Sequence, residues 1–337
     1  MESKTAQKPQ VVFFHRKPRN VGNYSVEFIF DDVRNRLKEK ISSKIVQSKY
    51  ESKGLFKRIY NCIEAFRNQG KVNHVTGDIN YIGLLLNKKR TIQTILDCVH
   101  LNTSSGLKYS VLKLFWLSIP EKNARYITAI STSTKEEILR HHKCDPGKII
   151  VIPVAISPKF KAVEKPFNKQ KPRILQLGTA PNKNIPGLIE ALKGIPCVLN
   201  IIGKRNEDYE TLLRENKIEY IYEWGLSDED VIKRYEEADI VSLISTYEGF
   251  GMPILEAQAV GRAVITSNIY SMPEVAGDAA VLVDPFDIPE MRTGLERIIN
   301  DDEFRNEMIQ RGFQNIKRFD ADRIARQYFE LYKKIIS

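Results

Sequence analysis

Cysteine is scarce in this 337-residue sequence, and long apolar runs are absent. The spacing of the four cysteines fits neither a metal site nor a disulfide framework, which favours a reducing compartment. No apolar stretch approaches the ~20 residues that span a bilayer, and the polar first residues do not resemble a signal peptide. We therefore predict a cytoplasmic protein with no metal centre. The cysteines are Cys62, Cys98, Cys144 and Cys197.

Positive charge is concentrated in the N-terminal half. Residues 1–150 hold 27 Lys and Arg against 13 Asp and Glu, a net +14, and residues 151–337 hold 25 against 29, a net −4. Much of the excess lies between Arg34 and Arg58. One interpretation is a solvated helix face, and the other is attraction to an anionic surface or acceptor. No recognised nucleic-acid-binding module accompanies the charge. The second interpretation therefore favours an anionic membrane surface, with the protein peripheral at the inner face of the cytoplasmic membrane.

Two series of alternating strands and helices predict an α/β protein with two doubly wound domains. The proline- and lysine-rich stretch 158–172 separates them, so we expect domains at 1–160 and 161–319. The strands of the first series are expected at 11–14, 72–75, 91–96, 126–130 and 148–152, and its helices near 24–41, 55–66, 112–117 and 135–141. Those of the second are expected at 173–177, 198–202, 220–222, 239–244, 263–266 and 280–283, with helices at 185–192 and 252–260.

Two glutamates eight residues apart, Glu248 and Glu256, flank a glycine-rich turn between an expected strand and an expected helix. Glycine lets a ligand approach the backbone, and the free N–H groups of a helix start favour an anion such as phosphate. A carboxylate can accept two hydrogen bonds from a vicinal diol. A phosphate site between two carboxylates that bind hydroxyl groups suits a nucleotide-sugar.

The block from Glu248 to Glu256, EGFGMPILE, resembles the glutamate-x7-glutamate signature of retaining GT-B glycosyltransferases, especially family 4. The similarity continues through residues 257–267 and 271–277. It implies two Rossmann-like domains facing across a cleft, the N-terminal one for the acceptor and the C-terminal one for a nucleotide-sugar donor. A last helix, about 320–337, would return to the N-terminal domain. It further implies transfer with retention to a glycan acceptor, which the positive N-terminal half suggests is lipid-linked, without metal or cofactor.

The resemblance also assigns residues. Lys183 would neutralise the leaving diphosphate, and Arg205 would assist because Thr179 stands where relatives carry an arginine. Asp97 belongs to a motif near the donor sugar, in which Leu96 fills the histidine slot and His100 would substitute. The expected catalytic residues are Glu248, Lys183, Arg205, His100 and Asp97. The expected donor-binding residues are Glu256, Gly249, Phe250, Gly251, Met252, Pro253, Gly178, Thr179, Asn182, Trp224, Gly225, Gly22, His74 and Asp78.

Two other functions stay open at this point. A nucleotide-sugar 2-epimerase shares the GT-B architecture, although the block from Glu248 to Glu256 resembles transferases better. The departures at Leu96 and Thr179 also suit a catalytically silent subunit that binds sugar nucleotides. The sequence names neither the sugar, the base nor the acceptor.

Overall fold

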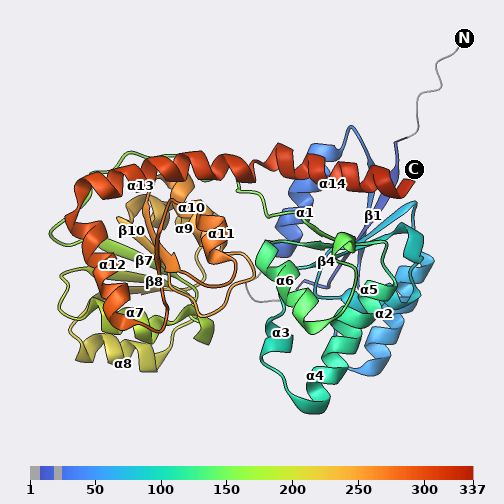
Figure 1. Cartoon of the computed structure of the whole chain (residues 1–337), viewed down its shortest axis with the longest axis horizontal. Coiled ribbons are helices and arrows are strands. Elements are labelled where there is room, and N and C mark those ends of the chain that lie inside the picture. Colours follow the sequence, from blue (N-terminus) through green and yellow to red (C-terminus); the bar gives the residue numbers. More distant parts are fainter. Residues whose placement is uncertain (1–7, 19–24, 337) are drawn as a thin grey trace, which may run out of the picture. The chain divides into compact units, whose positions relative to one another are not determined.

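The computed structural model describes residues 8–18 and 25–336, which form two compact units (Figure 1). Unit 1 comprises residues 1–155 and 321–337, and unit 2 comprises residues 156–320. Each unit contains one six-stranded sheet in which every recorded strand pair is parallel. No helix in the described part of the chain is both long enough and apolar enough to cross a bilayer.

The sheet of unit 1 has the strand order β2-β1-β3-β4-β5-β6. Both of its faces are covered: Val11 and Phe13 of β1 pack with α1 and α14, whereas Val12 and Phe14 pack on the α2 side. Successive side chains of a strand point to opposite faces, so a strand buried on both sides reads as a continuous apolar run. The strands are β1 (Gln10–His15), β2 (Ser42–Gln47), β3 (Val72–Val75), β4 (Thr91–Ile95), β5 (Tyr126–Ala129) and β6 (Ile149–Val151). The helices are α1 (Ser25–Leu37), α2 (Leu55–Arg67), α3 (Val99–Asn102), α4 (Gly106–Lys113), α5 (Ile119–Lys122), α6 (Thr132–His141) and α14 (Ala321–Ile336), with a 3₁₀ helix η1 (Asn80–Leu85).

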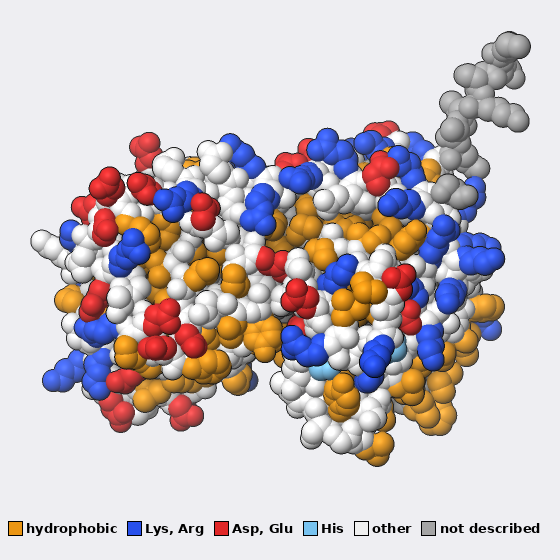
Figure 2. Space-filling model, in the orientation of Figure 1, with side chains coloured by type: hydrophobic (Ala, Val, Ile, Leu, Met, Phe, Trp, Pro, Cys, Tyr) orange, Lys and Arg blue, Asp and Glu red, His pale blue; other side chains and the backbone are white. Residues whose placement is uncertain are grey.

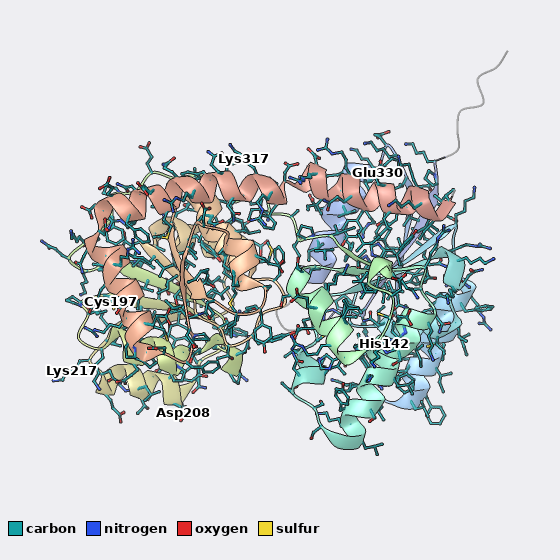
Figure 3. The ribbon with its side chains drawn as sticks, in the orientation of Figure 1. His142, Cys197, Asp208, Lys217, Lys317 and Glu330 are labelled. Atoms are coloured by element: carbon teal, nitrogen blue, oxygen red, sulfur yellow. The ribbon has the colours of Figure 1, made fainter. Side chains whose placement is uncertain are left out.

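Helix α14 completes the core of unit 1, although about 165 residues of unit 2 precede it in the chain. Its buried face includes Tyr328 and Tyr332, which pack around His74 of β3. The opposite face is polar, and Glu330 there pairs with Lys333 at 2.7 Å (Figure 3). Helix α14 therefore belongs to unit 1 and not to unit 2.

The sheet of unit 2 has the order β12-β11-β10-β7-β8-β9, with β7 and β10 at its centre. Its core joins the strand residues Ile174 and Ile240 to α7 and α12. The strands are β7 (Arg173–Leu177), β8 (Val198–Ile202), β9 (Glu219–Glu223), β10 (Ile240–Leu243), β11 (Ala263–Ser267) and β12 (Val281–Val283). The helices are α7 (Ile185–Leu192), α8 (Glu207–Glu215), α9 (Asp228–Glu237), α10 (Met252–Val260), α11 (Met272–Ala276), α12 (Ile288–Asn300) and α13 (Asp302–Asn315).

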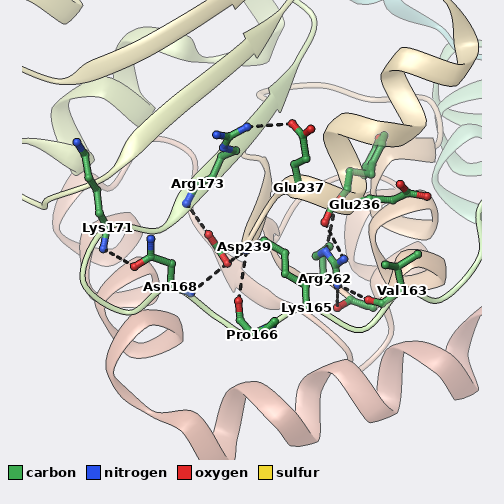
Figure 4. A network of polar contacts seen from close by, with 12 residues as sticks. Val163, Lys165, Pro166, Asn168, Lys171, Arg173, Glu236, Glu237, Asp239 and Arg262 are labelled. Carbon is green, nitrogen blue, oxygen red and sulfur yellow. Dashed lines mark hydrogen bonds and ion pairs between the residues drawn. The ribbon is translucent and has the colours of Figure 1, made fainter.

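A polar network fastens the proline- and lysine-rich stretch to unit 2 (Figure 4). Asp239, which is buried just before β10, accepts hydrogen bonds from the backbone N–H groups of Asn168 (3.2 Å) and Arg173 (2.7 Å) and pairs with Lys165. The guanidinium of Arg262 donates to backbone carbonyls that include that of Val163 at 3.0 Å. These bonds satisfy buried charges that would otherwise be costly, so this stretch is an ordered part of unit 2.

The structure corrects a secondary-structure prediction in unit 1. The helix expected near 24–41 ends at Leu37, and the unpredicted strand β2 follows it. Strand β2 lies at the edge of the sheet and exposes most of its residues, Ser42, Ser43 and Lys44 among them. It therefore lacks the apolar run by which the other strands were recognised.

The packing of α14 yields a stability prediction. Tyr332→Phe removes the hydroxyl that lies 2.8 Å from Nδ1 of His74 in the core of unit 1. A buried polar group left without its partner costs about 1–3 kcal/mol, so urea unfolding should show a loss of that size. Tyr60→Phe, which removes an exposed hydroxyl, should change the unfolding free energy by less than about 0.5 kcal/mol. Equal stability of the two variants would contradict the proposed role of this bond.

Candidate functional site

The order of strands in unit 2 reverses at β7. From β7 the chain proceeds outward to β8 and β9, then returns to place β10 on the other side of β7. In such sheets ligands bind outside the carboxyl ends of the strands where the order reverses. The loops 178–184 and 244–251 follow β7 and β10, so the two lie side by side at this point.

An ion pair joins the two loops. Nζ of Lys183 lies 2.6 Å from Oε1 of Glu248, and only 17% and 15% of the two side chains are exposed. The Ser245 hydroxyl donates to the same carboxylate oxygen at 2.7 Å. The structure therefore brings together two of the three predicted catalytic residues of unit 2, Lys183 and Glu248, which are 65 positions apart in sequence.

Hydrogen bonds between the loops hold this pair in place. The side-chain amide of Asn182 donates to the Tyr247 carbonyl at 2.9 Å. In the other direction, the Thr246 N–H donates to the Asn182 carbonyl at 2.8 Å. Asn182, which was predicted to bind the donor, therefore has a positioning role between the two loops.

Gly178 makes room for the lysine. Its φ of +82° lies in the left-handed region, which favours glycine. A Cβ at this position would lie 2.9 Å from Cε of Lys183. The glycine therefore lets the lysine stem cross the backbone toward Glu248.

The glycine-rich turn leads into α10 as the sequence predicts. Gly251 precedes the helix with a φ of +101°, and Met252 and Pro253 form its first turn. Oγ of Ser271 lies 2.9 Å from each of the carbonyl oxygens of Glu248 and Phe250 and so fixes the turn from the next loop. A helix start of this kind presents backbone N–H groups and a positive dipole end to an anion.

Glu256 lies one turn into α10 and accepts a hydrogen bond from the hydroxyl of Tyr235 at the end of α9. Burial raises the pKa of Glu256 to about 7, against the lowering effects of that hydroxyl and of the Lys183 ammonium. Perturbed carboxyl groups of this kind concentrate at functional sites. Tyr235 was not predicted, because a buried tyrosine on an amphipathic helix carries no separate signal in a single sequence.

The remaining predicted residues of unit 2 have other partners or are exposed to solvent. The Thr179 hydroxyl donates to the Lys204 carbonyl at 2.8 Å. Arg205 pairs with Glu210 at 2.7 Å and leaves 68% of its side chain exposed. Trp224 is exposed at the end of β9, where Gly225 has a φ of +73°. The side chains of Arg205 and Trp224 are thus largely exposed to solvent.

Phe250 requires a correction. Its side chain is buried and packs edge-on against Phe319, with ring centroids 5.8 Å apart. The ring anchors the turn instead of facing a ligand, so the donor contact predicted for this residue is wrong for its side chain. Gly249, beside it, stays half-buried in the turn.

The strand order of unit 1 also reverses, between β1 and β3, and a second ion pair lies there. Arg16 follows β1 and pairs with Asp78, which follows β3 and has a φ of +58°. Asp97 and His100 follow β4 and line one small cavity together. Leu96 packs against Gly77, where a Cβ would lie 3.0 Å from the leucine. The space expected for a histidine is thus filled by an apolar contact.

His74 cannot bind a donor. It is fully buried, with Nδ1 2.8 Å from the Tyr332 hydroxyl and Nε2 2.8 Å from the Thr94 hydroxyl. Burial lowers the pKa of His74 to about 3, and the neighbouring His15 adds to the effect. It is a neutral core residue, and the prediction of a donor contact is wrong. Gly22, also predicted, lies outside the described residues.

The described residues contain no group of three or more His, Cys, Asp or Glu side chains placed to hold a metal ion. The site of unit 2 consists of the Lys183 ammonium, the carboxylates of Glu248 and Glu256, and the start of α10. This set can bind an anion between groups that accept hydrogen bonds from hydroxyls.

Part of the chain is similar to known glycosyltransferases. Residues 159–315 match the model of the family described as "Glycosyl transferases group 1". The chain is 31% identical over 235 residues to the O-antigen chain mannosyltransferase B of Escherichia coli, covering 63% of this chain and 61% of that protein. It is 26% identical over 225 residues to the MMP alpha-(1->4)-mannosyltransferase of Mycolicibacterium hassiacum, covering 63% and 54%. The chain thus spans less than two thirds of the length of these relatives.

Solved structures establish the fold. Anabaena Alr3699/HepE, in complex with UDP and glucose, superposes with a TM-score of 0.77 at 14% identity and covers 97% of this chain and 100% of its own. The glycosyltransferase WaaG, of lipopolysaccharide biosynthesis, gives 0.74 at 13% identity, covering 96% and 99%. The fold is that of the GT-B glycosyltransferases, as the sequence predicts.

The raised pKa of Glu256 predicts how stability depends on pH. When a carboxyl has a higher pKa in the folded than in the unfolded protein, its ionisation lowers the unfolding free energy. For Glu256 this loss occurs as pH rises from the ordinary pKa of 4.5 to the folded-state pKa of about 7. Glu256→Gln removes this charge, so the variant should gain unfolding free energy relative to the parent between pH 5 and pH 8. Urea unfolding at both pH values measures the change, with the exposed Glu229→Gln as the control. A difference that does not grow with pH would show that the carboxylate is not enclosed.

Proposed function

We propose that this chain is a glycosyltransferase that moves a sugar from a nucleotide-sugar to a glycan acceptor during synthesis of a cell-surface polysaccharide or glycoconjugate. The observation that carries the proposal is the placement of Lys183, Glu248 and the start of α10 where the strand order of unit 2 reverses. The family match over residues 159–315 supports it.

Each group then has a role in holding the donor. The Lys183 ammonium and the N–H groups at the start of α10 bind and neutralise the diphosphate as its negative charge develops. Glu256 accepts hydrogen bonds from the ribose diol. Glu248 accepts them from the sugar, and its pair with Lys183 orients the carboxylate before the sugar arrives. A positioned group of this kind accelerates transfer by fixing the reacting atoms in register.

We further propose retention of the anomeric configuration without a metal ion. The acceptor hydroxyl attacks the anomeric carbon on the face that the nucleotide leaves. The bond from the anomeric carbon to the phosphate oxygen breaks as the new glycosidic bond forms, and the departing phosphate oxygen takes the hydroxyl proton. Glu248 is then a positioning group and forms no covalent intermediate.

The identities of sugar and acceptor extend the proposal. The named relatives are mannosyltransferases, so mannose is the first sugar to test. The excess of cations in residues 1–150 suits a lipid-linked glycan at an anionic membrane surface. Release of nucleotide with and without acceptor separates a transferase from a 2-epimerase and from a silent binding subunit.

Substitution of the paired glutamates tests the central assignment. Glu256→Ala should weaken nucleotide affinity by ~1.5–3 kcal/mol, the usual value of a charged hydrogen bond. Glu248→Ala should instead lower turnover with little change in nucleoside diphosphate affinity, since its partner is the sugar. Calorimetry and a nucleotide-release assay measure the two quantities, with Glu229→Ala as the exposed control. Unchanged binding and turnover in both glutamate variants would reject the donor site.

The lysine and the absence of a metal requirement give a second test. Lys183→Ala should lower turnover by about 10²-fold or more, as removal of one group stabilising a developing anion does. Arg205→Ala should have a smaller effect, because Arg205 is exposed and pairs with Glu210. Chelator should leave the rate unchanged. Activity lost in chelator and restored by a divalent ion would contradict the metal-independent mechanism.

A further inference from the structure

Helix α2 of unit 1 turns an apolar face toward solvent. Its large apolar side chains recur at intervals of one, three and four residues, which places them on one side of the helix. Phe56 is 86% exposed, Leu55 66% and Phe66 55%. Apolar side chains gather over this part of unit 1 at the lower right of Figure 2. The apolar face of α2 consists of Leu55, Phe56, Ile59, Tyr60, Ile63 and Phe66.

A different side of α2 attaches it to unit 1. The buried residues of the helix are small or polar: Asn61, Cys62 and Ala65. The amide of Asn61 donates to the Tyr81 hydroxyl at 3.0 Å, and the Cys62 thiol lies 3.6 Å from the Tyr81 carbonyl. The apolar face is thus not needed to hold the helix in place. Soluble monomers rarely expose a contiguous apolar face of this kind unless it binds something.

The segment that contains α2 is rich in cations, and Nζ of Lys49 lies 5.3 Å from the ring centroid of Tyr60 in the apolar face. Residues 42–71 contain seven Lys and Arg against two acidic residues, a net charge of +5. One of the two acids, Glu51, already pairs with Lys53 at 3.1 Å. The exposed cations are Lys44, Lys49, Lys53, Lys57, Arg67 and Lys71.

The apolar face and the cations together favour one kind of binding partner over others. A second copy of this chain would bring another surface of +5 against the first, and like charges repel. Nucleic acid would match the cations but would leave the aliphatic side chains Leu55, Ile59 and Ile63 without a partner. An anionic bilayer matches both, because its headgroups attract the cations and its acyl boundary accepts the apolar side chains.

We propose that α2 lies in the interface of an anionic membrane, with its apolar face inserted at the acyl boundary and its flanking lysines among the headgroups. Phe56 and Tyr60 have the aromatic rings that favour this depth. Docking of α2 would hold the enzyme at the membrane where a lipid-linked glycan is presented. This purpose rests on the proposed function. The docking itself requires neither donor nor transfer.

Co-sedimentation of the full chain with vesicles tests the proposal. The probes are vesicles of phosphatidylcholine alone and vesicles with 30% phosphatidylglycerol, in a salt series from about 0.05 to 0.5 M, over which exposed charges become screened. We expect binding to the anionic vesicles at low salt. Phe56→Gln/Ile59→Gln should weaken it by about tenfold or more through loss of apolar burial, and Lys53→Gln/Lys57→Gln by a similar factor.

Matched variants in unit 2 serve as controls. Leu282→Gln/Phe286→Gln removes a comparable exposed pair, and Lys161→Gln/Lys233→Gln removes two exposed cations. Both should bind vesicles as the parent does. The proposal is overturned by absence of binding at low salt, by equal binding to neutral vesicles, or by an apolar-face variant that binds like the parent. A parent that is dimeric in light scattering and becomes monomeric in Phe56→Gln/Ile59→Gln, without binding vesicles, would assign the face to a second copy instead.

Failure of docking can be told apart from failure of the proposed function. Nucleotide release with a soluble glycan acceptor does not involve vesicles, and α2 contains none of the donor-site residues. Phe56→Gln/Ile59→Gln should therefore keep the rate on a soluble acceptor and lose only its preference for acceptor presented on anionic vesicles. If release is absent in the parent while vesicle binding follows the expected pattern, the transfer proposal fails and the membrane proposal stands.

Discussion

An ion pair bridges the point of strand reversal in each unit, and the candidate site depends on it. Arg16 and Asp78 follow β1 and β3, and Lys183 and Glu248 follow β7 and β10. In each case a cation from the loop after the first strand meets a carboxylate from the loop on that strand's other side. Removing Glu248 would leave the Lys183 ammonium, which is only 17% exposed, without this carboxylate, and breaking a buried ion pair in this way is strongly destabilising. The pairing therefore keeps the loops together before any ligand binds.

Strands were predictable where both faces are buried, because they then read as apolar runs; Val11 to Phe14 is an example. The edge strand β2 was missed because Ser42, Ser43 and Lys44 face solvent and carry no such signal. The end of α1 was misplaced for the same reason, since its polar continuation resembles a helix surface. The sequence of a short segment does not reveal which strand lies beside it in the sheet, and the exposure of its side chains depends on that neighbour.

The candidate site, like the fold, was predictable from the sequence only in part. The glycine-rich turn and Glu256 could be recognised locally, because a strand, a turn and a helix start follow one another in sequence. The contact of Lys183 with Glu248 could not be derived from spacing, since it depends on the order of strands. His74 was misjudged because its position at a strand end looks the same whether the side chain faces a ligand or the core. Only the packing of α14, hundreds of residues later, decides this.

That late packing bears on how the chain reaches its native state during synthesis. Unit 2 is continuous in sequence and can gather all its strands as soon as they leave the ribosome. The core of unit 1 forms later, because Tyr328 and Tyr332, which close over His74, are translated only after the whole of unit 2. The first segment of unit 1 must therefore wait until unit 2 and α14 have been synthesised. During that interval the uncovered face of its sheet is the surface that a chaperone would have reason to shield.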